Sequence, residues 1–111
     1  MMIYKILRHP EWSQFQSDGQ THGAPVDRVD GFVHFSTALQ LGETLRRHFS
    51  KEGDLVLLAC RDADLGEALR WERSRGGDLF PHLYRALTMD DIAWSRDVAR
   101  TPRGHETGPL E

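Results

Sequence analysis

The chain has 111 residues, a formal net charge of −3 and an isoelectric point near 6.0. This length predicts one domain that buries a core without disulfide or metal staples. The weakly acidic charge excludes a basic surface field that would attract nucleic acid to the whole protein. Binding of RNA at a local site is the nucleic-acid function that stays open. No apolar run reaches the ~20 residues that span a bilayer, and residues 1–5 carry no export signal. Together with a single cysteine, Cys60, these features predict a cytoplasmic protein with no membrane partner.

Residues 3–35 predict two short strands separated by a helix and a loop. Residues 3–7 are rich in β-branched and aromatic side chains, which are typical of a strand. A helix is expected to begin near Pro10, because proline fits the first helical turn. The polar residues 17–30, which include three glycine or proline positions, predict a loop. Residues 31–35 then form the second predicted strand.

The clearest element is a helix that follows this strand directly. Thr37 and Gln40 match a capping box, in which each side chain accepts a hydrogen bond from the other residue's backbone N–H. Apolar residues recur at helical spacing, which predicts one buried face made of Ala38, Leu41, Leu45 and Phe49. The unbroken apolar run of residues 54–60 is typical of a strand buried on both faces. We therefore expect this helix to pack against that strand.

The chain from residue 61 to residue 84 predicts a turn and two more strands. Residues 61–69 indicate a turn that includes one helical turn, and residues 70–73 indicate a strand. Residues 74–78 contain Gly76-Gly77 and predict a flexible loop. Residues 80–84 return to the sheet, where Pro81 predicts an edge or irregular strand because proline cannot donate to the ladder.

The last predicted strand covers residues 91–95, and the sequence beyond it is rich in turn-forming residues. Residues 1–98 are expected to form a single domain, followed by a disordered tail at residues 99–111. The final Leu110-Glu111 looks like a cloning remnant. Short strands with one main helix after the second strand predict an α+β fold rather than a regular alternating series.

Two of the six histidines, His34 and His82, lie within aromatic and apolar neighbours. Strand alternation places His34 and Ser36 on one face, beside the helix that begins after Thr37. Free N–H groups and the helix dipole make such a junction suited to a phosphate or carboxylate. The alternative is structural: a histidine satisfied by a core hydrogen bond and a serine that assists the helix cap.

A second polar group surrounds Glu72. If residues 70–73 are extended, Arg70 and Glu72 share a face, and the flanking arginines keep Glu72 ionised. The alternative is an exposed ion-pair cluster of small energetic worth. No zinc-type spacing of cysteine and histidine occurs, so no metal is expected, and Cys60 is expected to be an inert core residue.

Three separated motifs carry a family resemblance: Asp30-Gly31-Phe32-Val33-His34-Phe35-Ser36-Thr37 with Gln40, then Leu69-Arg70-Trp71-Glu72, then Phe80-Pro81-His82-Leu83-Tyr84. With them the chain resembles the uncharacterised DUF952 family from residue 3 to about residue 95. That family looks in turn like a distant relative of the ADP-ribosyltransferase fold, particularly of RNA 2′-phosphotransferases. The resemblance implies a small split β-sheet, with His34 placed against an NAD ribose or phosphate. The chain departs from these relatives in its first strand, which carries no histidine where many of them have one. Arg8 is the candidate replacement for that histidine, and Glu72 is the candidate for their late catalytic glutamate.

The residues and the resemblance together favour a small enzyme or degenerate enzyme that binds an NAD-like or other phosphorylated small molecule. His34, Glu72 and His82 are the candidate catalytic residues, with His34 binding or protonating the ligand, Glu72 acting as base or ribose anchor and His82 assisting. The candidate ligand-binding residues are Ser36, Thr37, Gln40, Arg70 and Tyr84. NAD is implied by the resemblance alone. The alternatives are a non-catalytic module for a small anionic metabolite and a protein-interaction domain.

Overall fold

The computed structural model describes residues 1–110, without the side chain of residue 75, as an α+β fold. Its helices are α1 (His9–Asp18), α2 (Pro25–Asp30) and α3 (Ala38–Phe49), with short 3₁₀ segments η1 (Asp62–Ala68), η2 (Arg75–Gly77) and η3 (Met89–Asp91). Its strands are β1 (Met2–Arg8), β2 (Gln20–Thr21), β3 (Val33–His34), β4 (Leu55–Arg61), β5 (Leu69–Arg73), β6 (Leu79–Leu83), β7 (Leu87–Thr88), β8 (Ile92–Thr101) and β9 (Gly104–Glu106). The α+β prediction is confirmed, with the strands divided among separate sheets. Within residues 1–110 no helix is long and apolar enough to cross a membrane.

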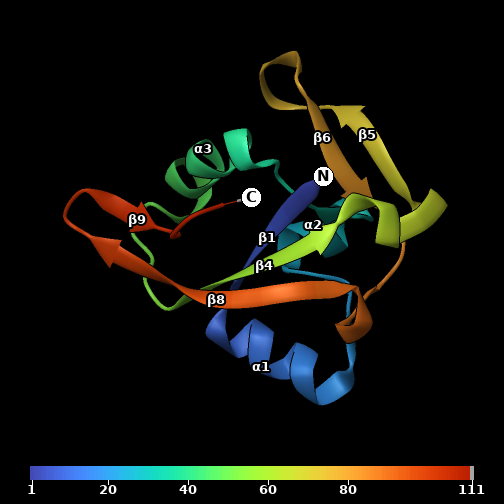
Figure 1. The fold of residues 1–111 in the computed structure, drawn as a ribbon, viewed down its shortest axis with the longest axis horizontal. Coiled ribbons are helices and arrows are strands. Elements are labelled where there is room, and N and C mark those ends of the chain that lie inside the picture. The colour runs from blue at the N-terminus through green and yellow to red at the C-terminus, as the bar shows by residue number, and fades with distance from the viewer. Residues whose placement is uncertain (111) are drawn as a thin grey trace.

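The largest sheet has four antiparallel strands in the order β1-β4-β8-β9. β4 lies between the first strand and β8, with Met2 opposite Arg61 and Leu55 opposite Val98. Its residues from Leu55 to Cys60 are all buried, which confirms the predicted central strand. Figure 1 shows α1 and α3 on either side of this sheet.

Alternation along β1 and β4 divides the core into two clusters, because successive side chains point to opposite faces. On one face Leu41 and Leu45 of α3 pack with Leu55 and Leu57, and Phe49 lies partly buried beside them. The predicted packing of the helix against this strand is therefore confirmed. On the other face the cluster contains Phe15 of α1 and side chains from β3 and β6; its members are Ile3, Leu7, Phe15, Val33, Phe35, Val56, Leu58, Cys60, Leu65, Leu83 and Leu87.

A separate three-stranded sheet has the order β3-β6-β5, so β6 is its central strand. Of the two alternatives predicted for Pro81, an edge or an irregular strand, the edge position is wrong, because β6 lies between β3 and β5. The Pro81 carbonyl accepts a hydrogen bond from the Phe35 N–H, at 2.9 Å, on the β3 side of the strand. The N–H and C=O of one residue point to the same side in an antiparallel strand, so the N–H that proline lacks would also face β3. The proline therefore removes one hydrogen bond at the end of the two-residue β3 and none beside β5.

The expected loop at residues 17–30 is also wrong, because α1 continues to Asp18 and residues 25–30 form α2. Pro25 occupies the first helical position, where its missing N–H costs nothing. The Asp27 carboxylate accepts a hydrogen bond from the Ala24 N–H at 2.7 Å, and Gly31 ends the helix at φ 86°. These local features form a helix although Val29 on its outer face is exposed.

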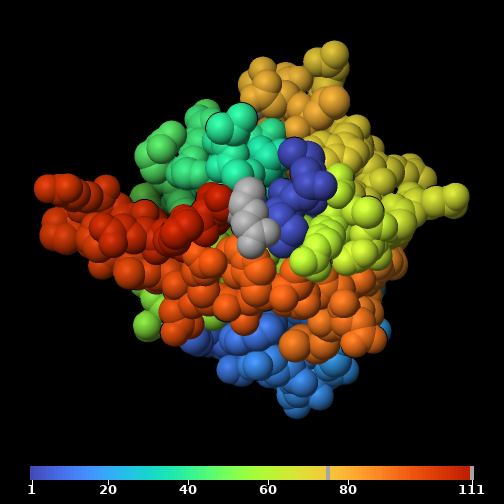
Figure 2. Space-filling model, viewed as in Figure 1, coloured from blue at the N-terminus to red at the C-terminus, as the bar shows by residue number. Residues whose placement is uncertain are grey.

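Residues 99–106 are not the predicted disordered tail. β8 extends to Thr101 and turns back into β9, with Gly104 at φ 117° and Thr101 Oγ1 accepting a hydrogen bond from the Arg103 N–H at 3.1 Å. Leu110 packs against the core cluster under α3, while Glu111, the second residue of the suspected cloning remnant, lies outside the described residues. Figure 2 shows this hairpin projecting from one side of the molecule, at the left of the view.

Candidate functional site

One face of the three-stranded sheet gathers the polar residues that the sequence singled out. His34 of β3 lies opposite His82 of β6, which lies opposite Arg70 of β5. Glu72 lies two residues along from Arg70 and therefore shares its face. His34, Glu72 and His82 thus point to the same side of this sheet, and the His34 and His82 ring centroids are 5.3 Å apart.

Glu72 fixes the orientation of the His82 imidazole. Glu72 Oε1 lies 2.9 Å from His82 Nδ1 and accepts a hydrogen bond from the Tyr84 hydroxyl at 2.6 Å. The hydrogen bonds from Tyr84 and His82 lower the pKa of Glu72, and the bond to Glu72 raises the pKa of Tyr84. Because an ionised carboxylate only accepts, His82 carries its hydrogen on Nδ1.

The second ring nitrogen of His82 has no hydrogen-bond partner within the described residues. His82 is only 4% exposed, and its ring packs against Phe32 with centroids 4.2 Å apart. Phe32 also contacts the His34 ring, with centroids 4.5 Å apart, so one phenyl ring packs against both imidazoles. With Nδ1 held by Glu72, Nε2 is the ring nitrogen of His82 that is left without a partner among residues 1–110.

His34 is engaged at both ring nitrogens. Its Nδ1 lies 2.6 Å from Asp27 Oδ1, and its Nε2 lies 3.0 Å from Asp30 Oδ2. An imidazole donates from both nitrogens only in its protonated form. The structure therefore gives His34 two carboxylate partners and leaves His82 as the imidazole with an unoccupied nitrogen.

Asp27 is the centre of this network, and the sequence reading did not find it. Its carboxylate is 0% exposed and accepts hydrogen bonds from four donors: Lys5 Nζ at 2.6 Å, Ala24 N–H at 2.7 Å, and His34 Nδ1 at 2.6 Å and N–H at 3.0 Å. Burial alone would raise the pKa of Asp27. The hydrogen bond from His34 and the charge of Lys5 together outweigh that effect, so the pKa of Asp27 is lowered overall. The available signal was an aspartate three residues after Ala24, where a helix cap needs an acceptor.

A cavity of about 580 Å³ lies between β1, α2, α3 and the three-stranded sheet, and we call it the β1–α3 cavity. His34, Ser36 and His82 line it, whereas Glu72 reaches it only through His82. Ser36 is held in place by two backbone hydrogen bonds with Tyr4 of β1, each 2.8 Å long, and its Oγ lies 2.8 Å from Thr44 Oγ1. The lining residues are Tyr4, Lys5, Ile6, Arg8, Ala24, Pro25, Val26, Asp30, His34, Phe35, Ser36, Leu41, Thr44, His48, Phe49, Ser74, Phe80 and His82.

Four of the expected ligand-binding residues do not line this cavity. Thr37 and Gln40 form the predicted capping box, with backbone N–H to side-chain oxygen distances of 3.0 and 3.3 Å. Gln40 also donates to the Leu79 carbonyl at 2.9 Å, which ties α3 to β6. Arg70 lies over the Tyr84 ring, 4.9 Å from its centroid. The structure thus brings His34, Ser36 and His82 to one cavity, whereas the other four expected ligand-binding residues make contacts elsewhere in the fold.

The permanent cations that line the β1–α3 cavity are paired with carboxylates. Lys5 is bound to Asp27, and Arg8 donates to Glu52 at 2.6 and 3.0 Å and to Glu11 at 3.3 Å. The bond to Glu52 raises the pKa of Arg8. Within residues 1–110, no group of three or more histidine, cysteine or acidic side chains is arranged to hold a metal ion.

Comparison with known proteins gives a family and one close structural relative. The model of DUF952, described as a protein of unknown function, matches residues 6–95. The crystal structure of protein CC0527 from Caulobacter crescentus is 42% identical in sequence and gives a TM-score of 0.90, covering 94% of this chain and 91% of that chain. Its solution NMR structure, also 42% identical, gives a TM-score of 0.84 over 96% and 91% of the two chains. No match was found among curated proteins.

Proposed function

The chain belongs to the DUF952 family of proteins of unknown function, and we propose that it binds a hydroxyl-bearing small molecule in the β1–α3 cavity. The Glu72–His82 pair would act on that hydroxyl group. The observation that carries the proposal is the buried Nε2 of His82, which has no hydrogen-bond partner within residues 1–110 and belongs to a residue that lines this cavity. A buried polar atom without a partner costs about 1–3 kcal/mol, so a histidine with a purely structural role would be expected to use both nitrogens, as His34 does.

The tautomer defines which ligand group would meet His82. Glu72 holds the hydrogen on Nδ1, so Nε2 accepts a hydrogen bond from a ligand O–H or N–H. A proton taken from a ligand hydroxyl would move to Nε2, and the Glu72 carboxylate, 2.9 Å from Nδ1, would stabilise the resulting imidazolium. Glu72 is a positioning residue in this scheme, because it reaches the cavity only through His82.

The walls of the cavity indicate the body of the ligand. Half of the lining side chains are apolar or aromatic and half are polar, so the cavity offers an apolar wall together with polar groups such as His82 and Ser36. A volume of about 580 Å³ is within the range of ligand pockets. An apolar or aromatic body with one or two hydroxyl groups satisfies both features.

An NAD-like molecule is the second candidate. The order of the His34 strand, the helix α3 and the buried strand β4 is the one expected of an ADP-ribosyltransferase relative. The diphosphate of NAD fits less well, because Lys5 and Arg8 are both engaged by carboxylates. We therefore derive no transfer step and rank a hydroxylated ligand of lower charge first.

A melting screen followed by calorimetry tests the proposal. The panel contains NAD, ADP-ribose, ribose 5-phosphate and uncharged nucleosides, since a ligand at a hundredfold excess over its Kd stabilises the protein by ~2.7 kcal/mol. His82→Asn then keeps an N–H donor near the Nδ1 position for Glu72 and removes the Nε2 group. His9→Asn is the matched control, because His9 pairs with Asp97 and lies outside the cavity lining.

We expect His82→Asn to melt within a few degrees of the wild type and to bind the best ligand about tenfold or more weakly, while His9→Asn binds normally. Equal affinity in a folded His82→Asn protein would show that His82 does not contact the ligand. A flat screen would exclude these ligands and favour the alternatives, a module for another metabolite or a protein-interaction domain.

A further inference from the structure

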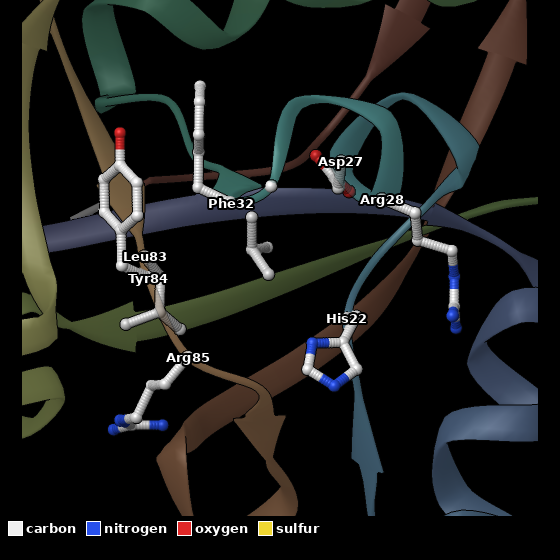
Figure 3. A pocket seen from close by; sticks show the side chains of 9 residues that line it. His22, Asp27, Arg28, Phe32, Leu83, Tyr84 and Arg85 are labelled. Carbon is white, nitrogen blue, oxygen red and sulfur yellow. The ribbon is translucent and has the colours of Figure 1, made fainter.

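We propose that a second cavity, on the other side of α2, binds a small organic anion with an apolar body. This α2–β6 cavity has a volume of about 370 Å³ and is lined by His22, Asp27, Arg28, Gly31, Phe32, Val33, Leu83, Tyr84 and Arg85. In Figure 3 its labelled side chains come from separate segments, with His22 and Arg28 on one side and Tyr84 and Arg85 on the other. The buried side chains of Val33 and Leu83 supply an apolar floor.

The charges that face this cavity do not cancel. Arg85 is bound to Asp91 at 2.8 and 3.0 Å, and the Asp27 carboxylate is saturated by Lys5, Ala24 and His34. By contrast, no hydrogen bond or ion pair joins the side chains of Arg28 or His22 to the described part of the chain. Asp27 is also the only described carboxylate in the lining. The Arg28 guanidinium and the His22 imidazole, both on exposed residues at the rim of the cavity, are therefore left to receive an anion, and a guanidinium binds carboxylate or phosphate with two donors.

Local backbone structure places both side chains. The Gly23 N–H donates to Thr21 Oγ1 at 3.0 Å, which closes a turn around His22, and Gly23 adopts φ 94°. A Cβ at Gly23 would lie within 2.1 Å of Asp27 Oδ2, so only glycine allows this approach. Arg28 follows Asp27 in α2, and the buried Asp27 anchors that helix to β1 through Lys5. Both residues are thus carried by an anchored segment.

The two cavities are separate sites. Pro25, Val26 and Asp30 of α2 line the β1–α3 cavity, whereas Arg28 lines only the α2–β6 cavity. Phe32 lines the second cavity alone, while its ring contacts His34 and His82, which line only the first. The first cavity has its permanent cations neutralised and the second does not, so they favour different ligands.

Titration of the ¹⁵N-labelled protein with phenyl phosphate tests the proposal, because this probe carries an anion on an apolar ring. We expect saturable shifts of the Gly31 and Val33 amide signals, and weaker shifts with inorganic phosphate, which lacks the apolar body. Arg28→Gln should weaken phenyl phosphate binding about tenfold or more, the effect of one lost charge-assisted contact. Arg103→Gln is the matched control, since it makes the same change in the exposed turn between β8 and β9.

Three results would overturn the proposal: no shift at Gly31 and Val33, equal binding by Arg28→Gln and Arg103→Gln, or inorganic phosphate binding as tightly as phenyl phosphate. Shifts confined to Ser36 and Thr44 would place the probe in the β1–α3 cavity and also reject the second site. The outcome is independent of the proposed function, because that function is tested by His82→Asn. A failure of either variant leaves the other site standing.

Discussion

Asp27→Asn is expected to destabilise the protein strongly, although the two side chains have nearly the same shape. Each carboxylate oxygen accepts two hydrogen bonds: Oδ1 from the His34 N–H and Nδ1, and Oδ2 from the Ala24 N–H and Lys5 Nζ. An asparagine retains one acceptor oxygen, so its NH₂ group must face two donors. That change loses one charged bond of about 1.5–3 kcal/mol and one neutral bond of about 0.5–1.5 kcal/mol. It also leaves Lys5, which is 6% exposed, without a counter-charge.

These losses add to roughly 2–4.5 kcal/mol, which overlaps the 3–5 kcal/mol typical of breaking a buried ion pair. We expect urea denaturation at pH 7 to give a loss of about 3–5 kcal/mol, a large part of the stability of an ordinary domain. Asp97→Asn is the control, because Asp97 is 81% exposed and its pair with His9 should contribute at most about 1 kcal/mol. A loss below about 1 kcal/mol for Asp27→Asn would refute the central role given to this carboxylate.

Three further predictions concern the core and the buried titratable groups. Leu45→Ala should cost about 2–5 kcal/mol in chemical denaturation, since Leu45 is buried between α3 and β4, and a loss below about 1 kcal/mol would contradict that burial. Burial raises the pKa of Cys60 to about 12, so an alkylating reagent at pH 8 should modify it only after urea unfolds the protein; rapid modification without urea would contradict its place in the core. Burial alone would raise the pKa of Asp27 and of Asp91, but their hydrogen bonds and cationic partners lower both overall. The stabilisation from these two carboxylates is therefore present above their unfolded-state pKa, near 3.9, and is lost as pH falls through their folded-state pKa values. The urea midpoint should accordingly drop between about pH 5 and pH 2. A midpoint that stays constant over this range would reject the assignment.

Helix α3 and strand β4 were predictable because their signals are local and strong. Thr37 and Gln40 sit three residues apart and form the cap that their spacing predicts. The apolar run of β4 lacks the apolar–polar alternation expected of a strand with one exposed face, and side chains cover both faces of β4 in the structure. Patterns of this kind do not depend on which other elements lie nearby.

The site was only partly predictable, because its chemistry depends on contacts between distant segments. The sequence indicated His34 and His82, and it could not indicate which imidazole would be engaged at both nitrogens. That outcome depends on α2, a six-residue helix whose exposed Val29 obscures any amphipathic pattern. The buried pair of Lys5 and Asp27 joins residues twenty-two positions apart, so no local sequence pattern indicates that these two side chains meet.

The β8–β9 hairpin was missed for a different reason, because its turn residues are also typical of disordered segments. Turn-forming residues such as Pro102 and Gly104 predict a disordered tail when they are considered alone. A tight turn between two strands uses the same types of residue. The alternation in β8 that buries Val98 was the signal that the strand continues.

The central position of β4 has a consequence for synthesis of the chain on the ribosome. Apart from the bridge between Tyr4 and Ser36, strand β1 has no strand partner until β4 emerges, and β8 completes the other side of β4 a few seconds later, at ~5–20 residues per second. We therefore expect the four-stranded sheet to be completed only after β8 and β9 have emerged, with a large loop-closure cost. Until β4 has emerged, the largely apolar segment from Ile3 to Leu7 remains accessible. We therefore expect this first strand to be the segment that a chaperone binds.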